Sequence, residues 1–159
     1  MSKGVDTGVN FGIASGVITT LGLIVGLYAG TSSFAAVIGG VLTIAIADSC
    51  SDALGIHIAK EGEQGVGQRE VWQATLTTLL TKALVSLSFL VPLLIFPHTI
   101  GVLASVVWGV VLLTILSFYL ARKACENPFY AVFEHLSIAV LVIFVTHWMG
   151  KFVAHHFPA

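Results

Sequence analysis

Five apolar stretches, each long enough to cross a lipid bilayer as a helix, constrain this chain more than any other feature. A spanning helix needs about 20 apolar residues. The stretches lie at about 9–28, 34–58, 76–96, 100–120 and 129–149. Backbone groups in hydrocarbon must be hydrogen-bonded within their own segment, and the alternation typical of barrel strands is absent. We therefore expect an all-α membrane protein in which residues 1–159 form a single transmembrane domain.

The composition agrees with a membrane environment. The 159 residues are 57% hydrophobic and 9% charged, whereas a soluble domain carries about 25% charged residues. So few charges could not cover the surface of a protein in water. The lipid bilayer is therefore an expected partner of this chain.

Several function classes find no support in the sequence. The formal charge is −1 and no basic patch is present, which argues against a nucleic-acid partner. Cys50 and Cys125 form no Cys-x-x-Cys pair, so a structural zinc or a thiol-redox site is not expected. Zinc-protease, nucleophile-elbow and nucleotide-binding motifs are missing, so we expect neither an enzyme nor ATP-driven transport.

The basic residues predict an orientation. Lys and Arg occur before the first stretch and in the second and fourth connections: Lys3, Lys60, Arg69, Arg122 and Lys123. The first and third connections contain neither residue type. The positive-inside rule then places the N-terminus in the cytoplasm, and five spans place the C-terminus on the opposite side. We expect a multi-pass protein of the cell membrane or of a vacuole-like organelle membrane.

Two acidic residues, Asp48 and Asp52, interrupt the second apolar stretch. A carboxylate at this depth costs at least about 2.5–3.5 kcal/mol, so an intramembrane acid indicates a functional site. Residues four apart share one helix face, and we expect Ser51 to share that face and to add its hydroxyl. Hard oxygen ligands of this kind suit Mg²⁺, Ca²⁺, Mn²⁺ or Fe²⁺.

The close spacing of the two acids suggests how such a site would work. Two carboxylates in a low-dielectric interior repel each other, so at least one is expected to hold a proton when no metal is bound. An incoming divalent ion would displace that proton, which predicts metal/proton exchange. The alternative is a proton-sharing pair that only bonds to neighbouring helices.

The first apolar stretch carries glycines at a spacing that allows close helix contact. Gly12 and Gly16 form one such pair. A stripe of small or hydroxyl-bearing residues follows at helical spacing: Ser15, Thr19, Gly22 and Gly26. The stripe has two interpretations. One is packing within a single chain. The other is a homodimer seam through the first helix whose hydroxyls, those of Ser15 and Thr19, act as supporting metal ligands.

The hydrophilic loop at residues 60–70 contains three acids, Glu61, Glu63 and Glu70. One interpretation is a cytoplasmic mouth that captures metal before it reaches Asp52. The other is an ordinary solvated loop.

Lys82 and Pro92 lie in the third apolar stretch. We expect Lys82 to extend its ammonium to the headgroups, the alternative being a deep position paired with Asp48 or Asp52. Pro92 lacks an N–H group and predicts a kink in the third helix.

Several blocks of the sequence resemble the vacuolar iron transporter family. The residues 11–26, FGIASGVITTLGLIVG, are similar to the first helix of that family. The acid-bearing second helix, the Trp72-Gln73-Ala74 segment and the block Leu90-Val91-Pro92-Leu93-Leu94 are also similar. With five spans in total, the resemblance covers most of the chain.

The resemblance implies a homodimer whose cation path runs between the subunits, lined by the first and second helices. It implies export of Fe²⁺ or Mn²⁺ from the cytoplasm in exchange for protons, with no cofactor beyond the transported metal.

The sequence departs from the family pattern in three places. Ser15 stands where the first helix usually carries an acid, and Asp48 stands where the second helix usually carries a methionine. Asp52 matches the glutamate that follows. The metal-binding domain of the family is replaced by the loop at 60–70. The first two changes move a carboxylate from the first helix to the facing second helix. They also replace a soft thioether ligand with hard carboxylate oxygens.

The predicted function is therefore a divalent metal exporter that exchanges Fe²⁺ or Mn²⁺ for protons. The competing hypothesis is a non-transporting membrane scaffold or partner subunit in which the pair Asp48 and Asp52 is structural.

Overall fold

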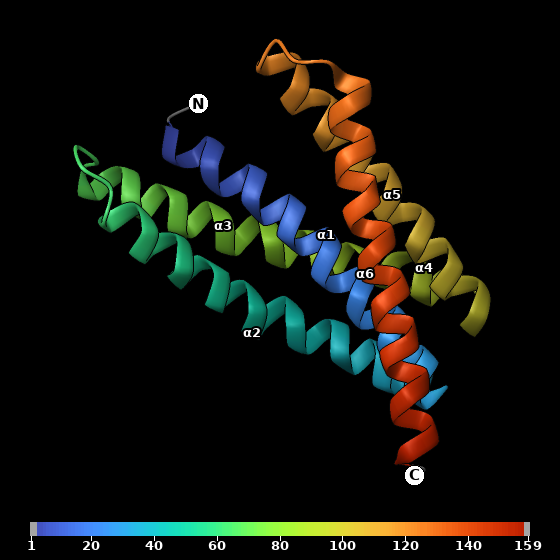
Figure 1. Cartoon of the computed structure of the whole chain (residues 1–159). Helices are drawn as coiled ribbons and strands as arrows, with labels where there is room; N and C mark the ends of the chain where they lie inside the picture. Colours follow the sequence, from blue (N-terminus) through green and yellow to red (C-terminus); the bar gives the residue numbers. More distant parts are fainter. Residues whose placement is uncertain (1–2, 158–159) are drawn as a thin grey trace.

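The computed structural model describes residues 3–157, and its described part is helical with no strand. The elements are α1 (Lys3–Thr31), α2 (Phe34–Glu61), α3 (Gln68–Ser88), α4 (Leu90–Ile95), α5 (His98–Lys123) and α6 (Pro128–His156), drawn in Figure 1. Five helical segments are long and apolar enough to cross a membrane, with α3 and α4 counted together as one. The predicted class, a five-span all-α membrane protein, is confirmed. The orientation of the termini stays a prediction.

The third span is broken, as Pro92 predicts. The break falls at Phe89, between α3 and α4. A proline ring clashes with the carbonyl four residues earlier, which here belongs to Ser88, the last residue of α3. Trp108 of α5 covers this break and donates from Nε1 to Ser88 Oγ at 3.0 Å.

The connections that carry the basic residues gather at one end of the bundle. Figure 1 shows the N-terminus, the α2–α3 loop and the α5–α6 connection toward this end, and the C-terminus at the other. Lys123 at the end of α5 donates to Asp6 in the first turn of α1 at 2.7 Å. We call this the basic end. Its existence fits the sorting of Lys and Arg on which the predicted orientation depends.

The central helix is α1, which packs on α2, α3, α5 and α6. Its glycines permit close approach within the chain. A Cβ on Gly16 would lie 3.1 Å from Val85 Cγ1 of α3, and one on Gly22 would lie 3.0 Å from Val142 Cγ1 of α6. The glycines at 12 and 16 and those at 22 and 26 therefore pack within the chain, as the intramolecular interpretation has it, and a homodimer seam through the first helix stays a prediction.

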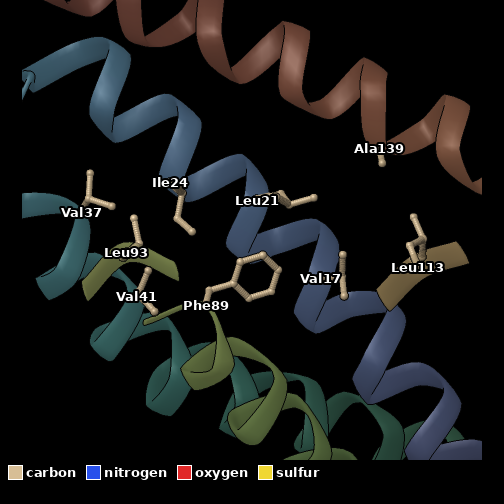
Figure 2. Close-up of a cluster of buried hydrophobic side chains, with 9 residues drawn as sticks. All are labelled: Val17, Leu21, Ile24, Val37, Val41, Phe89, Leu93, Leu113 and Ala139. Carbon is tan, nitrogen blue, oxygen red and sulfur yellow. The ribbon is translucent and has the colours of Figure 1, made fainter. Parts of the chain in front are cut away.

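The apolar core lies deeper in the bundle, as seen from the basic end, than the charged interior residues of α1, α2 and α3. Figure 2 shows its buried side chains: Val17, Leu21, Ile24, Val37, Val41, Phe89, Leu93, Leu113 and Ala139. On α1 they follow Ser15, on α2 they precede Asp48, and at the end of α3 and in α4 they follow Lys82. The charged residues of the bundle interior therefore lie between this core and the basic end.

Candidate functional site

Four side chains from three helices meet at the inner edge of the core. The Lys82 ammonium lies 2.5 Å from Oδ2 of Asp48 and 2.5 Å from Oδ2 of Asp52. It also donates to Ser15 Oγ at 2.9 Å, and that hydroxyl donates to Asp52 Oδ2 at 2.5 Å. We call these four residues the Lys82 cluster.

Helical periodicity and close packing explain this meeting. Asp48 and Asp52 are four residues apart on α2 and therefore point the same way. Gly12 and Gly16 bracket Ser15 on α1 and let α1 approach the α3 backbone at Lys82. A Cβ on Gly12 would lie 3.1 Å from Lys82 N, and one on Gly16 would lie 3.3 Å from Lys82 O. The glycine pair therefore places the Ser15 hydroxyl within reach of the ammonium.

The two contacts of Lys82 with carboxylates differ in kind. The contact with Asp52 is an aligned hydrogen bond. Asp48 Oδ2 accepts no hydrogen bond from the described residues, so its contact with Lys82 is an ion pair with poor hydrogen-bond geometry. Of the two acids, Asp48 therefore has the weaker hydrogen bonding to Lys82.

The cluster is buried on the lysine side and partly open on the acid side. The side chain of Lys82 is 0% exposed, whereas those of Asp48 and Asp52 are 30% and 22% exposed. Two carboxylates face one ammonium, so with all three groups ionised the cluster carries one excess negative charge. This excess can be balanced by a proton or by an added cation.

The prediction that Lys82 reaches the headgroups is wrong, and the alternative of pairing with the acids is confirmed. Lys82 lies fourteen residues into α3, which corresponds to about 21 Å of helix. The lysine stem cannot span that distance, and the two carboxylates supply its counter-charge locally.

The other predicted oxygen ligands of the membrane region lie outside the cluster. Thr19 donates its hydroxyl to the Ser15 carbonyl at 2.9 Å, along its own helix. Ser51 is exposed on the outer side of α2. Neither side chain contacts Lys82 in the described structure, so a role for either in binding metal stays a prediction.

The three acids of the predicted mouth lie at or beyond the ends of α2 and α3. Glu61 ends α2 nine residues after Asp52, about 14 Å along the helix. Glu63 accepts from Lys60 at 2.6 Å, and Glu70 lies in the first turn of α3. The structure does not bring them to the cluster, and metal capture by them stays a prediction.

A second set of buried polar side chains went unnoticed in the sequence. On α3 it comprises Thr75, Thr78 and Ser86, all buried on the helix face that carries Lys82. Thr20 of α1 donates to Ser86 Oγ at 3.0 Å. The signal was present, because these α3 residues recur at the three- and four-residue spacing of one helix face.

The cluster holds one cation already, the Lys82 ammonium. Within residues 3–157 no group of three or more His, Cys, Asp or Glu side chains is placed to hold a metal ion. A divalent metal at Asp48 and Asp52 would therefore have to displace the ammonium or gain further oxygen ligands.

Comparison with protein-family models and with curated proteins finds no match to this chain. The resemblance to the vacuolar iron transporter family stays a hypothesis, and the Lys82 cluster is the feature of the described residues that bears on function.

Proposed function

We propose that this multi-pass membrane protein exchanges a divalent metal cation, Fe²⁺ or Mn²⁺, for protons and exports the metal from the cytoplasm. Asp48 and Asp52 would bind metal and protons in turn. The observation that carries the proposal is the meeting of Lys82 with both acids inside the bundle.

The cost of burying these charges argues for a role beyond stability. Ionisable residues at bilayer depth are expensive and mark ion or proton pathways. A buried ion pair is often no more stabilising than apolar side chains of the same volume. Three ionisable residues at one point of an otherwise apolar bundle are therefore better explained by cation binding than by helix packing.

The charge balance of the cluster supports exchange. One excess negative charge attracts a proton or a metal ion, and both would use the same carboxylate oxygens. Asp48, whose Oδ2 accepts no hydrogen bond among the described residues, would be the acid that exchanges its partner more readily. Because binding one species weakens binding of the other, the site couples their movements.

The position of the core supports one-sided access. The apolar cluster around Val17, Leu21 and Phe89 separates the Lys82 cluster from the far end of the bundle. Ions would reach the site from the basic end in this conformation, and release on the other side would require the core helices to move apart.

A homodimer would complete the site through α2. The outer side of α2 carries exposed small residues at every fourth position: Ala35, Gly39, Thr43, Ala47, Ser51, Gly55 and Ala59. Small residues at this spacing let membrane helices approach closely. A second copy packed here would cover the exposed parts of Asp48 and Asp52 and bring further oxygen ligands, which places the proposed seam on α2 instead of α1.

The scaffold hypothesis keeps one specific observation in its favour. Lys82 already supplies a counter-charge, so the acids need no metal to be stable inside the bundle. Under this hypothesis the cluster joins α1, α2 and α3 and transports nothing.

Transport by the reconstituted protein separates the two hypotheses. Liposomes containing the full chain would be loaded with a pH dye, and Mn²⁺ uptake and proton movement would be recorded together. We expect Mn²⁺ uptake with opposite proton movement, reduced at least tenfold in Asp48→Asn and Asp52→Asn and unchanged in Glu126→Gln, an acid of the α5–α6 connection. Competition by Fe²⁺, Zn²⁺ and Ca²⁺ would rank the cations. Absence of uptake by the wild type, with loss of folding in both Asn variants, would support the scaffold.

A further inference from the structure

A groove follows the outer face of α5 toward the basic end. It has a volume of about 420 Å³ and is lined by Thr114, Ile115, Phe118, Tyr119 and Arg122. We call it the α5 groove. Arg122 follows Thr114 by eight residues, which corresponds to about 12 Å of helix. One leaflet contributes about 15 Å, half of the hydrocarbon core of a typical bilayer, so the groove has the length of most of one leaflet.

The inner part of the α5 groove is apolar. Thr114 donates its hydroxyl to the Val110 carbonyl at 2.7 Å, so this side chain is bonded within its own helix. Ile115 and Phe118 are 62% and 42% exposed and present hydrocarbon to the groove. A molecule that fills this part must therefore be apolar itself.

The outer end of the α5 groove carries a cation. Arg122 lies in the last turn of α5, a helix of 26 residues and therefore about 39 Å, longer than the hydrocarbon core of about 30 Å. The guanidinium carbon lies 5.4 Å from the centroid of the Phe118 ring, a cation–π contact that keeps the charge over the groove. The groove therefore has an apolar interior and a positive end near the headgroups.

Arg122 has no counter-charge in the described structure. None of the ion pairs among the described residues involves its guanidinium, and Glu126, four residues later, is not within ion-pair distance. The neighbouring Lys123 is paired with Asp6. A guanidinium presents its N–H groups as a planar fork that can bind two oxygens of one phosphate. Tyr119, 55% exposed, adds an aromatic ring of the kind that lies at the headgroup level.

We propose that the α5 groove binds one anionic phospholipid, with its phosphate on the Arg122 guanidinium and one acyl chain along Phe118 and Ile115. The apolar interior fits the chain, and the unpaired cation fits the negative headgroup. Basic residues beside a membrane helix attract anionic lipids. A zwitterionic lipid carries a cation beside its phosphate and would place a like charge near Arg122. The site is independent of the proposed metal exchange.

The headgroup contact can be tested on the purified full chain. Native mass spectrometry in detergent would measure the binding of palmitoyl-oleoyl phosphatidylglycerol and phosphatidylcholine. We expect the wild type to bind phosphatidylglycerol at least fivefold more tightly, and Arg122→Gln to lose this preference. Arg69→Gln makes the same charge change at an exposed position near the start of α3 and should keep the preference within twofold. Equal losses in the two variants, or no preference in the wild type, would overturn the proposal.

A second measurement locates the acyl chain. Phosphatidylglycerol with a photoreactive diazirine in one chain would be cross-linked to the protein in nanodiscs, and the labelled peptides would be identified after digestion. We expect residues 114–122 to carry at least fivefold more label than the exposed apolar face of α6 around Val140, Leu141 and Phe144. Even labelling of the two helices would show that the groove holds only bulk lipid and would overturn the proposal. Loss of the label to an equal concentration of oleate would assign the groove to a free fatty acid, which would also overturn it.

Discussion

The ammonium of Lys82 and the carboxylate of Asp52, 30 residues apart in sequence, lie 2.5 Å apart inside a five-helix membrane bundle. Ser15 bonds to both groups, and Asp48 approaches the same ammonium from the same face of α2. The arrangement brings three ionisable side chains of α2 and α3 together at one point. Its consequences for stability, ion binding and assembly can be measured separately.

Replacement of Lys82 should destabilise the protein. Lys82→Met leaves two carboxylates without their counter-charge. Loss of one partner of a fully buried pair costs about 3–5 kcal/mol, and we expect about 2–4 kcal/mol here because the acids are partly exposed. Thermal unfolding in detergent would measure the change. Lys60→Met, which removes the exposed pair with Glu63, should leave the unfolding temperature nearly unchanged.

A compensating variant checks that charge is the cause. Lys82→Met combined with Asp52→Asn removes one unpaired charge and should recover at least half of the lost stability. If the double variant is no more stable than Lys82→Met, the effect comes from packing around the lysine stem.

A carboxylate at Ser15 should strengthen metal binding. Ser15→Asp places a third acid against the cluster and adds one negative charge beside Asp52. We expect Mn²⁺ affinity, measured by calorimetry on the purified protein, to rise about tenfold or more, a change of about 1.4 kcal/mol. Ser15→Asn, of the same shape but neutral, should give no increase. Equal affinities in the two variants would argue against metal binding at this point.

Bulky residues on the outer side of α2 should disrupt assembly. A Cβ on Gly39 or Gly55 meets no atom of the chain within 4 Å, so Gly39→Leu and Gly55→Leu should leave the monomer fold intact. We expect both to reduce the dimer fraction in cross-linking or in mass measurements in detergent, because the side chains would hold two α2 helices apart. Gly16→Leu, which faces Val85 within the chain, should instead impair folding. A wild-type dimer fraction in both α2 variants would exclude this seam.

Part of the candidate site was predictable from local pattern alone. The burial cost of a carboxylate identified Asp48 and Asp52, and the helical period placed them on one face. The partner of the two acids was not predictable in the same way. Lys82 could lie at the headgroups or in the interior, and the choice depends on how far α3 extends beyond its apolar stretch. The helix begins at Gln68, eight residues before the predicted start at 76, which places Lys82 deep in the bundle.

The glycines of α1 were also only partly predictable from the sequence. Their spacing indicated close helix contact, which the structure has, but the spacing does not say with which helix. Gly12 and Gly16 contact α3, whereas Gly22 and Gly26 contact α6. The glycines of α1 therefore pack against helices of the same chain, whereas the outer side of α2 carries a row of exposed small residues.

The sequence by itself determined the five membrane helices, because hydrocarbon forces every backbone group to bond within its own segment and the length of an apolar run is a local property. It also determined that two acids share one helix face. Only the tertiary structure decided that Lys82 neutralises them, that Ser15 joins them, and that an apolar core closes one side. These contacts join residues distant along the chain, and they depend on which helix faces pack together, a choice made by the side-chain fit of the whole bundle.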